Sequence, residues 1–331
     1  MNLTSRTATI PLEMRLPRIA DLDESSSGWA FYLCARKERR TDRAGADFLA
    51  VVLQDMSGQI AAKVFDDVDA VQREFEVGEF VRVEGRGNRH YQKLELLIEK
   101  IRRVDEATDR QEGFREEDCI PCAPRPIEDM WQELRSRVAR ARNPWIRQLL
   151  TTILDRYGER LRIWPAALTV HHAYRGGLLE HILKLAETGE AMAAAYGADA
   201  DLLLAGAVLH DVGKIDELGY DGVTSYSLHG NLLGHITIGV MMVREAAAAI
   251  DGFPEDLRTR IEHMVVSHHG ERELGSPVEP MTAEAFILSS LDDLDATLHQ
   301  VRRHVQDDRG EGDFTVYHPR LGRVLLKPSG R

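Results

Sequence analysis

The hydrophobic pattern of the chain changes once, between residues 104 and 127, and this change limits the folds available to it. Residues 29 to 104 alternate apolar and polar side chains in short runs, for example at Leu94, Leu96 and Ile98. Turn-like sequences such as Asp55-Met-Ser-Gly58 interrupt these runs. The most economical interpretation is a set of five strands that close into a small barrel.

From Ile127 onward the pattern is helical, and Gly, Pro and Asn residues separate the apolar stretches. The tail after residue 312 reads as extended. The predicted fold class is therefore a multidomain β + α protein, an N-terminal β-barrel followed by an all-α domain. Helices are predicted near residues 127–141, 144–157, 177–196, 199–211, 231–250, 255–268 and 282–304.

The length of 331 residues suits two ordinary domains. We expect an N-terminal extension over residues 1–16, the barrel over 17–104, a linker over 105–126 and the helical domain over 127–331. The linker contains Cys119 and Cys122, which would supply two of the four ligands of a structural zinc site. Because no second Cys or His pair lies nearby, we favour an ordinary linker.

The composition is that of a soluble globular protein, with 43% hydrophobic and 29% charged residues. No apolar run approaches the ~20 residues that span a bilayer, so no membrane association is expected. The N-terminus lacks the apolar core of a secretory signal, so a cytoplasmic location and free cysteines are expected.

Charge and histidine are distributed unevenly along the chain. The net charge is −12, yet residues 27 to 104 hold 14 basic and 13 acidic residues, so the acidity lies in the rest of the chain. Of the 13 histidines, 12 lie at or after residue 171. The two parts of the chain therefore have different chemistry, and the second uses imidazole.

Several histidines and aspartates stand inside apolar helical stretches. His181 lies in GLLEHILKLAE with Leu178 and Leu185 on its side of the helix, and taken alone it reads as a core histidine. His210 and Asp211 end the apolar run LLLAGAVLHD. Burying an unpaired carboxylate costs several kcal/mol, and a bound cation would remove that cost.

Three further helices repeat this feature. His235 lies in NLLGHITIGVMM, His268 and His269 close MVVSHHG, and Asp292 lies in ILSSLDDLDATL. Imidazole and carboxylate without thiolate suit Mn, Fe, Ni, Zn or Mg rather than a structural zinc site. Since six or seven ligands exceed the need of one ion, we predict two ions about 3.5–4 Å apart, bridged by a carboxylate such as Asp211.

The order His181, His210-Asp211 and Asp292 resembles the signature of the HD-domain metal-dependent phosphohydrolases. More of the chain, roughly residues 17 to 325, resembles the YhaM-type 3'-to-5' exoribonucleases, in which an HD domain follows an OB-fold domain. The stretches HHAYRGGLLEHILKLAE, LHDVGKIDEL, LLGHITIG, SHHGERELGSPVEPMTAEAFIL and FLAVVLQDMSGQIAAKVFD carry this resemblance. The Cys119–Cys122 pair and His229 depart from the pattern.

The resemblance implies roles for these residues. One divalent ion would be held by His181, His210, Asp211 and Asp292, and Asp211 would bridge to a second held by His235 and His268. His269 could replace or accompany His268, because the sequence alone does not tell which imidazole faces inward. The family favours Mn²⁺, with Fe, Co, Ni, Mg and Zn as the other candidates.

Further residues would act on the substrate. Lys214 would neutralise charge on the scissile phosphate, and Arg175 with His171 and His172 would grip the backbone or protonate the leaving 3' oxygen. Their ordinary alternative is a solvated charge or a loop hydrogen bond, and Phe48 and Phe65 could equally belong to the barrel core. Candidate nucleic-acid contacts in the OB-fold are Arg36, Lys37, Arg40, Phe48, Phe65, Arg86, Arg89, Tyr91 and Lys93.

The favoured function is a 3'-to-5' exonuclease that acts on single-stranded RNA, and perhaps DNA, with the OB-fold guiding the strand. An HD phosphohydrolase for small nucleotides, such as a deoxynucleoside triphosphatase or a cyclic nucleotide phosphodiesterase, is the alternative. A nucleic-acid-binding protein without catalysis is disfavoured, because every expected ligand type is present. A homo-oligomer stays open.

Overall fold

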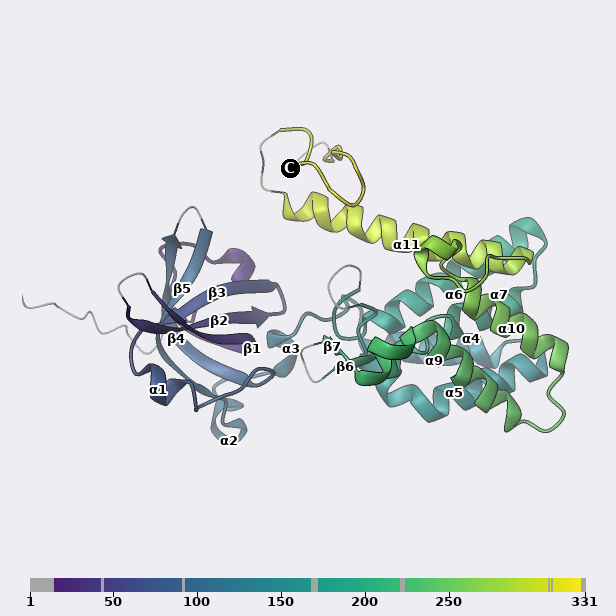
Figure 1. Cartoon of the computed structure of the whole chain (residues 1–331), viewed down its shortest axis with the longest axis horizontal. Helices are drawn as coiled ribbons and strands as arrows, with labels where there is room; N and C mark the ends of the chain where they lie inside the picture. Colours follow the sequence, from purple (N-terminus) through teal and green to yellow (C-terminus); the bar gives the residue numbers. More distant parts are fainter. Residues whose placement is uncertain are drawn as a thin grey trace, which may run out of the picture. The chain divides into compact units, whose positions relative to one another are not determined.

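The computed structural model describes residues 15–42, 45–90, 93–167, 172–220, 224–308, 310 and 312–328. These residues form two compact units, of which the first ends at Cys122 and the second begins at Ala123 (Figure 1). Within the described ranges, no helix is long and apolar enough to cross a membrane.

The first unit is a closed barrel of five strands in the order β1-β2-β3-β5-β4. All neighbouring pairs are antiparallel except β3 and β5, which are parallel and close the barrel. Alternate side chains of each strand fill its interior, among them Leu49, Leu53, Val81 and Leu96. The predicted barrel is confirmed, with β1 (Ser27–Thr41), β2 (Asp47–Asp55), β3 (Gly58–Val64), β4 (Phe80–His90) and β5 (Lys93–Arg103).

The segment expected as a linker is packed over most of its length. It contains the short helices α2 (Glu106–Asp109) and α3 (Glu116–Cys119), and Phe114 and Cys119 are buried. The guanidinium of Arg102 donates two 2.7 Å hydrogen bonds to the Asp109 carboxylate. Burial raises the pKa of the Cys119 thiol, so this cysteine is part of the barrel unit's interior.

The second unit is helical and has one continuous apolar core, to which Leu149, Leu179 and Ile261 belong. Side-chain caps start several helices, such as Asn143 at α5 and Asp199 at α7. All seven predicted helices are present. They are α4 (Ile127–Ala139), α5 (Pro144–Ile163), α6 (Gly177–Tyr196), α7 (Ala200–Leu209), α9 (Leu228–Ala248), α10 (Glu255–Ser267) and α11 (Ala283–Asp307).

The structure also has elements that the periodicity did not predict. The four-residue helix α8 (Lys214–Glu217) follows α7, and a hairpin of β6 (Leu218–Tyr220) and β7 (Thr224–Tyr226) leads into α9. The turn that follows α7 thereby packs against α9, where Gly213 lies next to the backbone of His235 and Gly239.

Candidate metal centre

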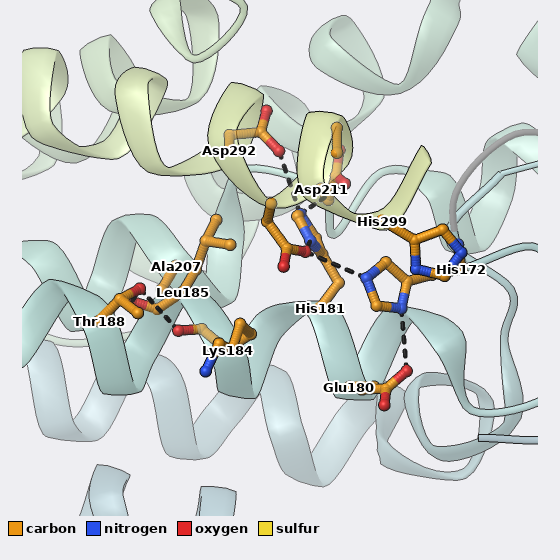
Figure 2. A network of polar contacts seen from close by, with 12 residues as sticks. His172, Glu180, His181, Lys184, Leu185, Thr188, Ala207, Asp211, Asp292 and His299 are labelled. Carbon is orange, nitrogen blue, oxygen red and sulfur yellow. Dashed lines mark hydrogen bonds and ion pairs between the residues drawn. The ribbon is translucent and has the colours of Figure 1, made fainter. Parts of the chain in front are cut away.

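The histidines and aspartates singled out in the sequence meet inside the helical unit. Helix α6 provides His181 and helix α11 provides Asp292, and Figure 2 shows both beside Asp211. His210 and Asp211 directly follow the last residue of α7. Close backbone packing completes the approach, because a Cβ atom on Gly213 would lie 2.0 Å from the carbonyl oxygen of His235. Glycine after the His-Asp pair is thus what lets this turn contact α9 directly.

A first cluster surrounds the Nε2 atom of His181. This atom lies 3.1 Å from Nε2 of His210 and 3.2 Å from Oδ1 of Asp292. Oδ2 of Asp211 lies 3.3 Å from Nε2 of His210 and 3.8 Å from Nε2 of His181. The His181, His210 and Asp292 ligand atoms all lie within 4.8 Å of one another, a spacing that one cation can fill.

A second cluster uses the other oxygen of Asp211. His235, His268 and His269 form a group whose ligand atoms also lie within 4.8 Å of one another. Oδ1 of Asp211 lies 3.5 Å from Nε2 of His235 and 3.7 Å from Nε2 of His268. Asp211 therefore has one oxygen directed at each cluster, as a bridging carboxylate would.

The second cluster contains polar atoms that lack protein partners. Oδ1 of Asp211, Nε2 of His235 and Nε2 of His268 are buried and form no hydrogen bond with the described residues. Leaving such atoms unsatisfied costs about 1–3 kcal/mol each. Because all three are electron-pair donors, a bound cation satisfies them and a hydrogen-bond acceptor does not. The residues present fit a metal centre.

The far side of each imidazole ring is fixed by a hydrogen bond from Nδ1. His210 donates to the carbonyls of Gly206 and Ala207, at 3.2 and 3.0 Å, and His268 donates to that of Val265 at 2.7 Å. A proton on Nδ1 leaves Nε2 with a free electron pair directed at the clusters, which is the tautomer of a metal ligand.

Two other ligand histidines donate to carboxylates that the sequence analysis did not single out. Nδ1 of His181 donates to Oδ2 of Asp295 at 2.8 Å, and Nδ1 of His235 donates to Oε1 of Glu217 at 3.0 Å. Asp295 follows Asp292 by nearly one helical turn, so the sequence contained a signal for it. Glu217 lies beyond the end of α7, and no periodicity indicated it.

The electrostatics of the clusters favour cations. Burial acts against the charged form of Asp211, but Lys214 and His210 outweigh it and hold the pKa of Asp211 well below its usual range. Burial also opposes a charge on His181, yet hydrogen bonds to Asp292 and Asp295 raise the pKa of His181 to about 9. Burial and the neighbouring His210 keep the pKa of His268 well below its usual range, so His268 is neutral at pH 7.

Lys214 lies at the centre itself. Its ammonium donates a 2.6 Å hydrogen bond to Oδ2 of Asp211, and the residue is 9% exposed. Burial opposes the ammonium charge, but Asp211 outweighs it and raises the pKa of Lys214. The structure places Lys214 beside the His-Asp pair with Asp211 as its partner, and its predicted action on a scissile phosphate stays a prediction.

Figure 2 shows His172 beside His181, on the side where Glu180 lies. Its Nδ1 lies 2.9 Å from Oε2 of Glu180 and its Nε2 lies 3.1 Å from Oδ2 of Asp295, so both ring nitrogens are engaged. This geometry makes His172 a support for Asp295 and does not favour the predicted contact with substrate. Arg175, predicted beside it, is half-buried, and its carbonyl accepts a hydrogen bond from Ala123, while His171 lies outside the described residues.

The predicted nucleic-acid contacts of the barrel have mixed surroundings. The rings of Phe48 and Phe65 lie 5.5 Å apart, and Phe65 is 50% exposed, so this pair is not fully enclosed in the core. The Lys37 ammonium donates to the carbonyls of Gln72 and Phe75 and pairs with Glu76, and this gives no support to the prediction that it binds nucleic acid.

The predicted arginines of the barrel are exposed but paired. Arg36 and Arg40 both pair with Glu38, at 3.2 and 2.7 Å. Lys93 is exposed, and Tyr91 lies outside the described residues. Arg86 and Arg89 form ion pairs with Glu99 and Glu24. Exposed ion pairs of this kind are worth about 0–1 kcal/mol, and binding of nucleic acid by these arginines stays a prediction.

The fold and the centre together define a class of protein, an OB-fold nucleic-acid-binding domain joined to a metal-binding HD domain. The family model of the HD domain matches residues 178–297, and that of the OB-fold nucleic acid binding domain matches residues 32–104. The chain belongs to the family of YhaM 3'-5' exoribonucleases.

Two relatives establish this membership. The chain is 33% identical over 297 residues to 3'-5' exoribonuclease YhaM of Geobacillus sp. (strain WCH70), covering 86% of this chain and 90% of the relative. It is 34% identical over 272 residues to the protein of the same name from Bacillus pumilus (strain SAFR-032), covering 82% of this chain and 85% of the relative.

Among solved structures, the second OB-fold domain of replication protein A from Methanococcus maripaludis is similar over 27% of this chain and 94% of that chain, with 19% identity and a TM-score of 0.23.

Proposed function

We propose that this protein hydrolyses single-stranded RNA from its 3' end, one phosphodiester bond at a time, at a centre of two divalent cations. The observation that carries the proposal is Asp211, a 2% exposed carboxylate whose two oxygens face two separate groups of imidazole nitrogens. The names of the two relatives, both 3'-5' exoribonucleases, support the direction and the RNA substrate.

The ligands divide into two sets around Asp211. His181, His210 and Asp292 would hold one cation with Asp211, and His235, His268 and His269 would hold the other with the same residue. When bound, such a pair of cations supplies an activated water and stabilises the charge of an in-line displacement at phosphorus. Because the donors are imidazole and carboxylate, a borderline first-row ion suits the set, and we favour Mn²⁺.

The protein's own groups would orient the substrate. Lys214 shares Asp211 with both clusters, so its ammonium is within reach of a phosphate held there and can donate to a non-bridging oxygen. In the barrel, Phe65 and Phe48 offer aromatic faces on which bases can stack, each stacked base contributing about 1–3 kcal/mol. Such stacking does not require a 2'-hydroxyl, so single-stranded DNA is a second substrate to test.

The test is a time course on one single-stranded RNA labelled separately at its 5' and 3' ends. With Mn²⁺ we expect a ladder that shortens the 5'-labelled strand progressively, and a mononucleotide released at once from the 3'-labelled strand. Chelator and the Asp211→Asn variant should both abolish the ladder. Intact RNA together with metal-dependent hydrolysis of free nucleotides would refute the proposal and favour a small-nucleotide phosphohydrolase.

A further inference from the structure

The two clusters use the same two kinds of hydrogen bond to hold their histidines in place. In the first, His210 donates to main-chain carbonyls and His181 donates to Asp295. In the second, His268 donates to a main-chain carbonyl and His235 donates to Glu217. Each cluster therefore contains one histidine whose orientation depends on a single, replaceable carboxylate.

Glu217 holds His235 by two hydrogen bonds to one oxygen. Its Oε1 accepts from the main-chain N–H of His235 at 3.0 Å and from Nδ1 of the same residue at 3.0 Å. Glu217 is 9% exposed. A buried carboxylate thus binds both the main-chain N–H and the ring of one histidine.

The main-chain bond exists because α9 is interrupted. Gly234, which directly precedes His235, has φ 69° and ψ 154°, a conformation that favours glycine. This break leaves the N–H of His235 outside the helical ladder, as at the first turn of a helix, where N–H groups need another acceptor. Glu217 supplies that acceptor and so fixes the ring of His235 where the second half of α9 begins.

The backbone of Glu217 is fixed independently of its side chain. Its carbonyl oxygen accepts a 2.9 Å hydrogen bond from the N–H of Ser227, and a Cβ atom on Gly230 would lie 2.0 Å from that oxygen. The carboxylate therefore extends from a rigid turn toward His235. Removing the carboxylate should leave the turn intact, so its effect can be measured in a folded protein.

We propose that Glu217 is a positioning residue that sets the affinity of the second cation position, the one formed by His235, His268 and His269 with Asp211. It fixes the tautomer that directs Nε2 of His235 at Oδ1 of Asp211, and its negative charge makes that nitrogen a better donor. The first position, supported by Asp295, is independent of Glu217. This inference rests on the two-cation function proposed above.

The experiment is Mn²⁺ binding to the metal-free full-length protein, measured by calorimetry and by the electron paramagnetic resonance signal of free Mn²⁺. The wild-type protein should bind two ions, and His235→Ala identifies which binding step belongs to the second position. Glu217→Ala should weaken that step by 10–100-fold and leave the other unchanged. Glu217→Gln should fall between, because its amide oxygen still accepts both hydrogen bonds but carries no charge.

Asp216→Asn is the matched control, since it removes a carboxylate from the same short helix. Asp216 is half-exposed and pairs with Arg160 at 2.7 Å, so both binding steps should match the wild type. Two outcomes would overturn the inference while leaving the two-cation function standing. One is an equal loss of both ions in Glu217→Ala, and the other is no loss of either. Binding of only one ion by the wild-type protein would instead overturn the two-cation function itself.

Discussion

Breaking the buried pair formed by Asp211 and Lys214 should destabilise the metal-free helical unit. Both groups are almost fully buried, and their 2.6 Å hydrogen bond is the shortest contact that either charged group makes at the centre. Replacing Asp211 by Asn leaves a buried ammonium without its main counter-charge. Removing one partner of such a pair costs about 3–5 kcal/mol.

The structure places this variant near the lower end of that range. Asp292 and Glu217 also act on the charge of Lys214, so part of its compensation survives the substitution. We expect Asp211→Asn to destabilise the metal-free helical unit by about 3 kcal/mol, because breaking a buried pair is costly. For a unit of roughly 200 residues this lowers its melting temperature by about 6–12 °C.

The double variant Asp211→Asn with Lys214→Met provides the decisive comparison. Removing both charges leaves no uncompensated group, so most of the lost stability should return, with a coupling energy of at least about 2 kcal/mol. Differential scanning calorimetry in chelator at pH 7.5 measures the three variants and the wild type. If the effects of the two single substitutions simply add, the ion pair does not govern this site and the reasoning is refuted.

The other predictions concern the ligands, the barrel surface and a salt bridge. His268→Gln should weaken Mn²⁺ binding in calorimetry more than His269→Gln, because only His268 is fully buried with a free Nε2, and the reverse order would refute this. Phe65→Ala should weaken single-stranded RNA binding in fluorescence anisotropy by 5–150-fold, the equivalent of about 1–3 kcal/mol for one stacked base; unchanged binding would place the contact elsewhere. Asp109→Asn should destabilise the barrel unit by about 1–2 kcal/mol, because its carboxylate accepts two hydrogen bonds from Arg102, which is itself partly exposed. Because Arg102 lowers the folded-state pKa of Asp109, the wild-type advantage is fully present above the unfolded pKa of about 3.9 and disappears as the pH falls through the folded value. Hydrogen exchange of barrel amides between about pH 2.5 and pH 6 tests the sign, and an advantage that grows toward low pH would contradict it.

The barrel, the seven helices and the clustered ligands could be predicted because each leaves a local mark on the sequence. Strand alternation and helical periodicity depend on the neighbours of each residue. His181 and Asp211 stand out because an unexplained polar group in an apolar run is rare. Such marks identify which residues are unusual and which side of an element they occupy.

The sequence contains no comparable signal for which group a polar side chain will bind in the folded protein. Lys37 belongs to a run of basic residues and reads as a surface cation, yet its ammonium is held by the main chain after α1 (Val68–Val71). A glutamate such as Glu217 is ordinary at the end of a helix, so its sequence context gives no signal. Its contact with the main-chain N–H of His235 depends on the break of α9 at Gly234. His172 was predicted to act on the substrate, and the sequence did not reveal that two carboxylates contact its two ring nitrogens.

Lys214 links the folding of the helical unit to its function. The clusters gather two carboxylates, Asp211 and Asp292, in a buried space, and without a cation their mutual repulsion would oppose folding. Lys214 and the protonated ring of His181 supply positive charge there until metal binds, so the unit can fold before it is loaded. If cations bound to Asp211, the ammonium would lose its partner and could then contact a phosphate, the group that the centre is proposed to bind. One residue would thereby stabilise the empty centre and contact the substrate of the loaded one.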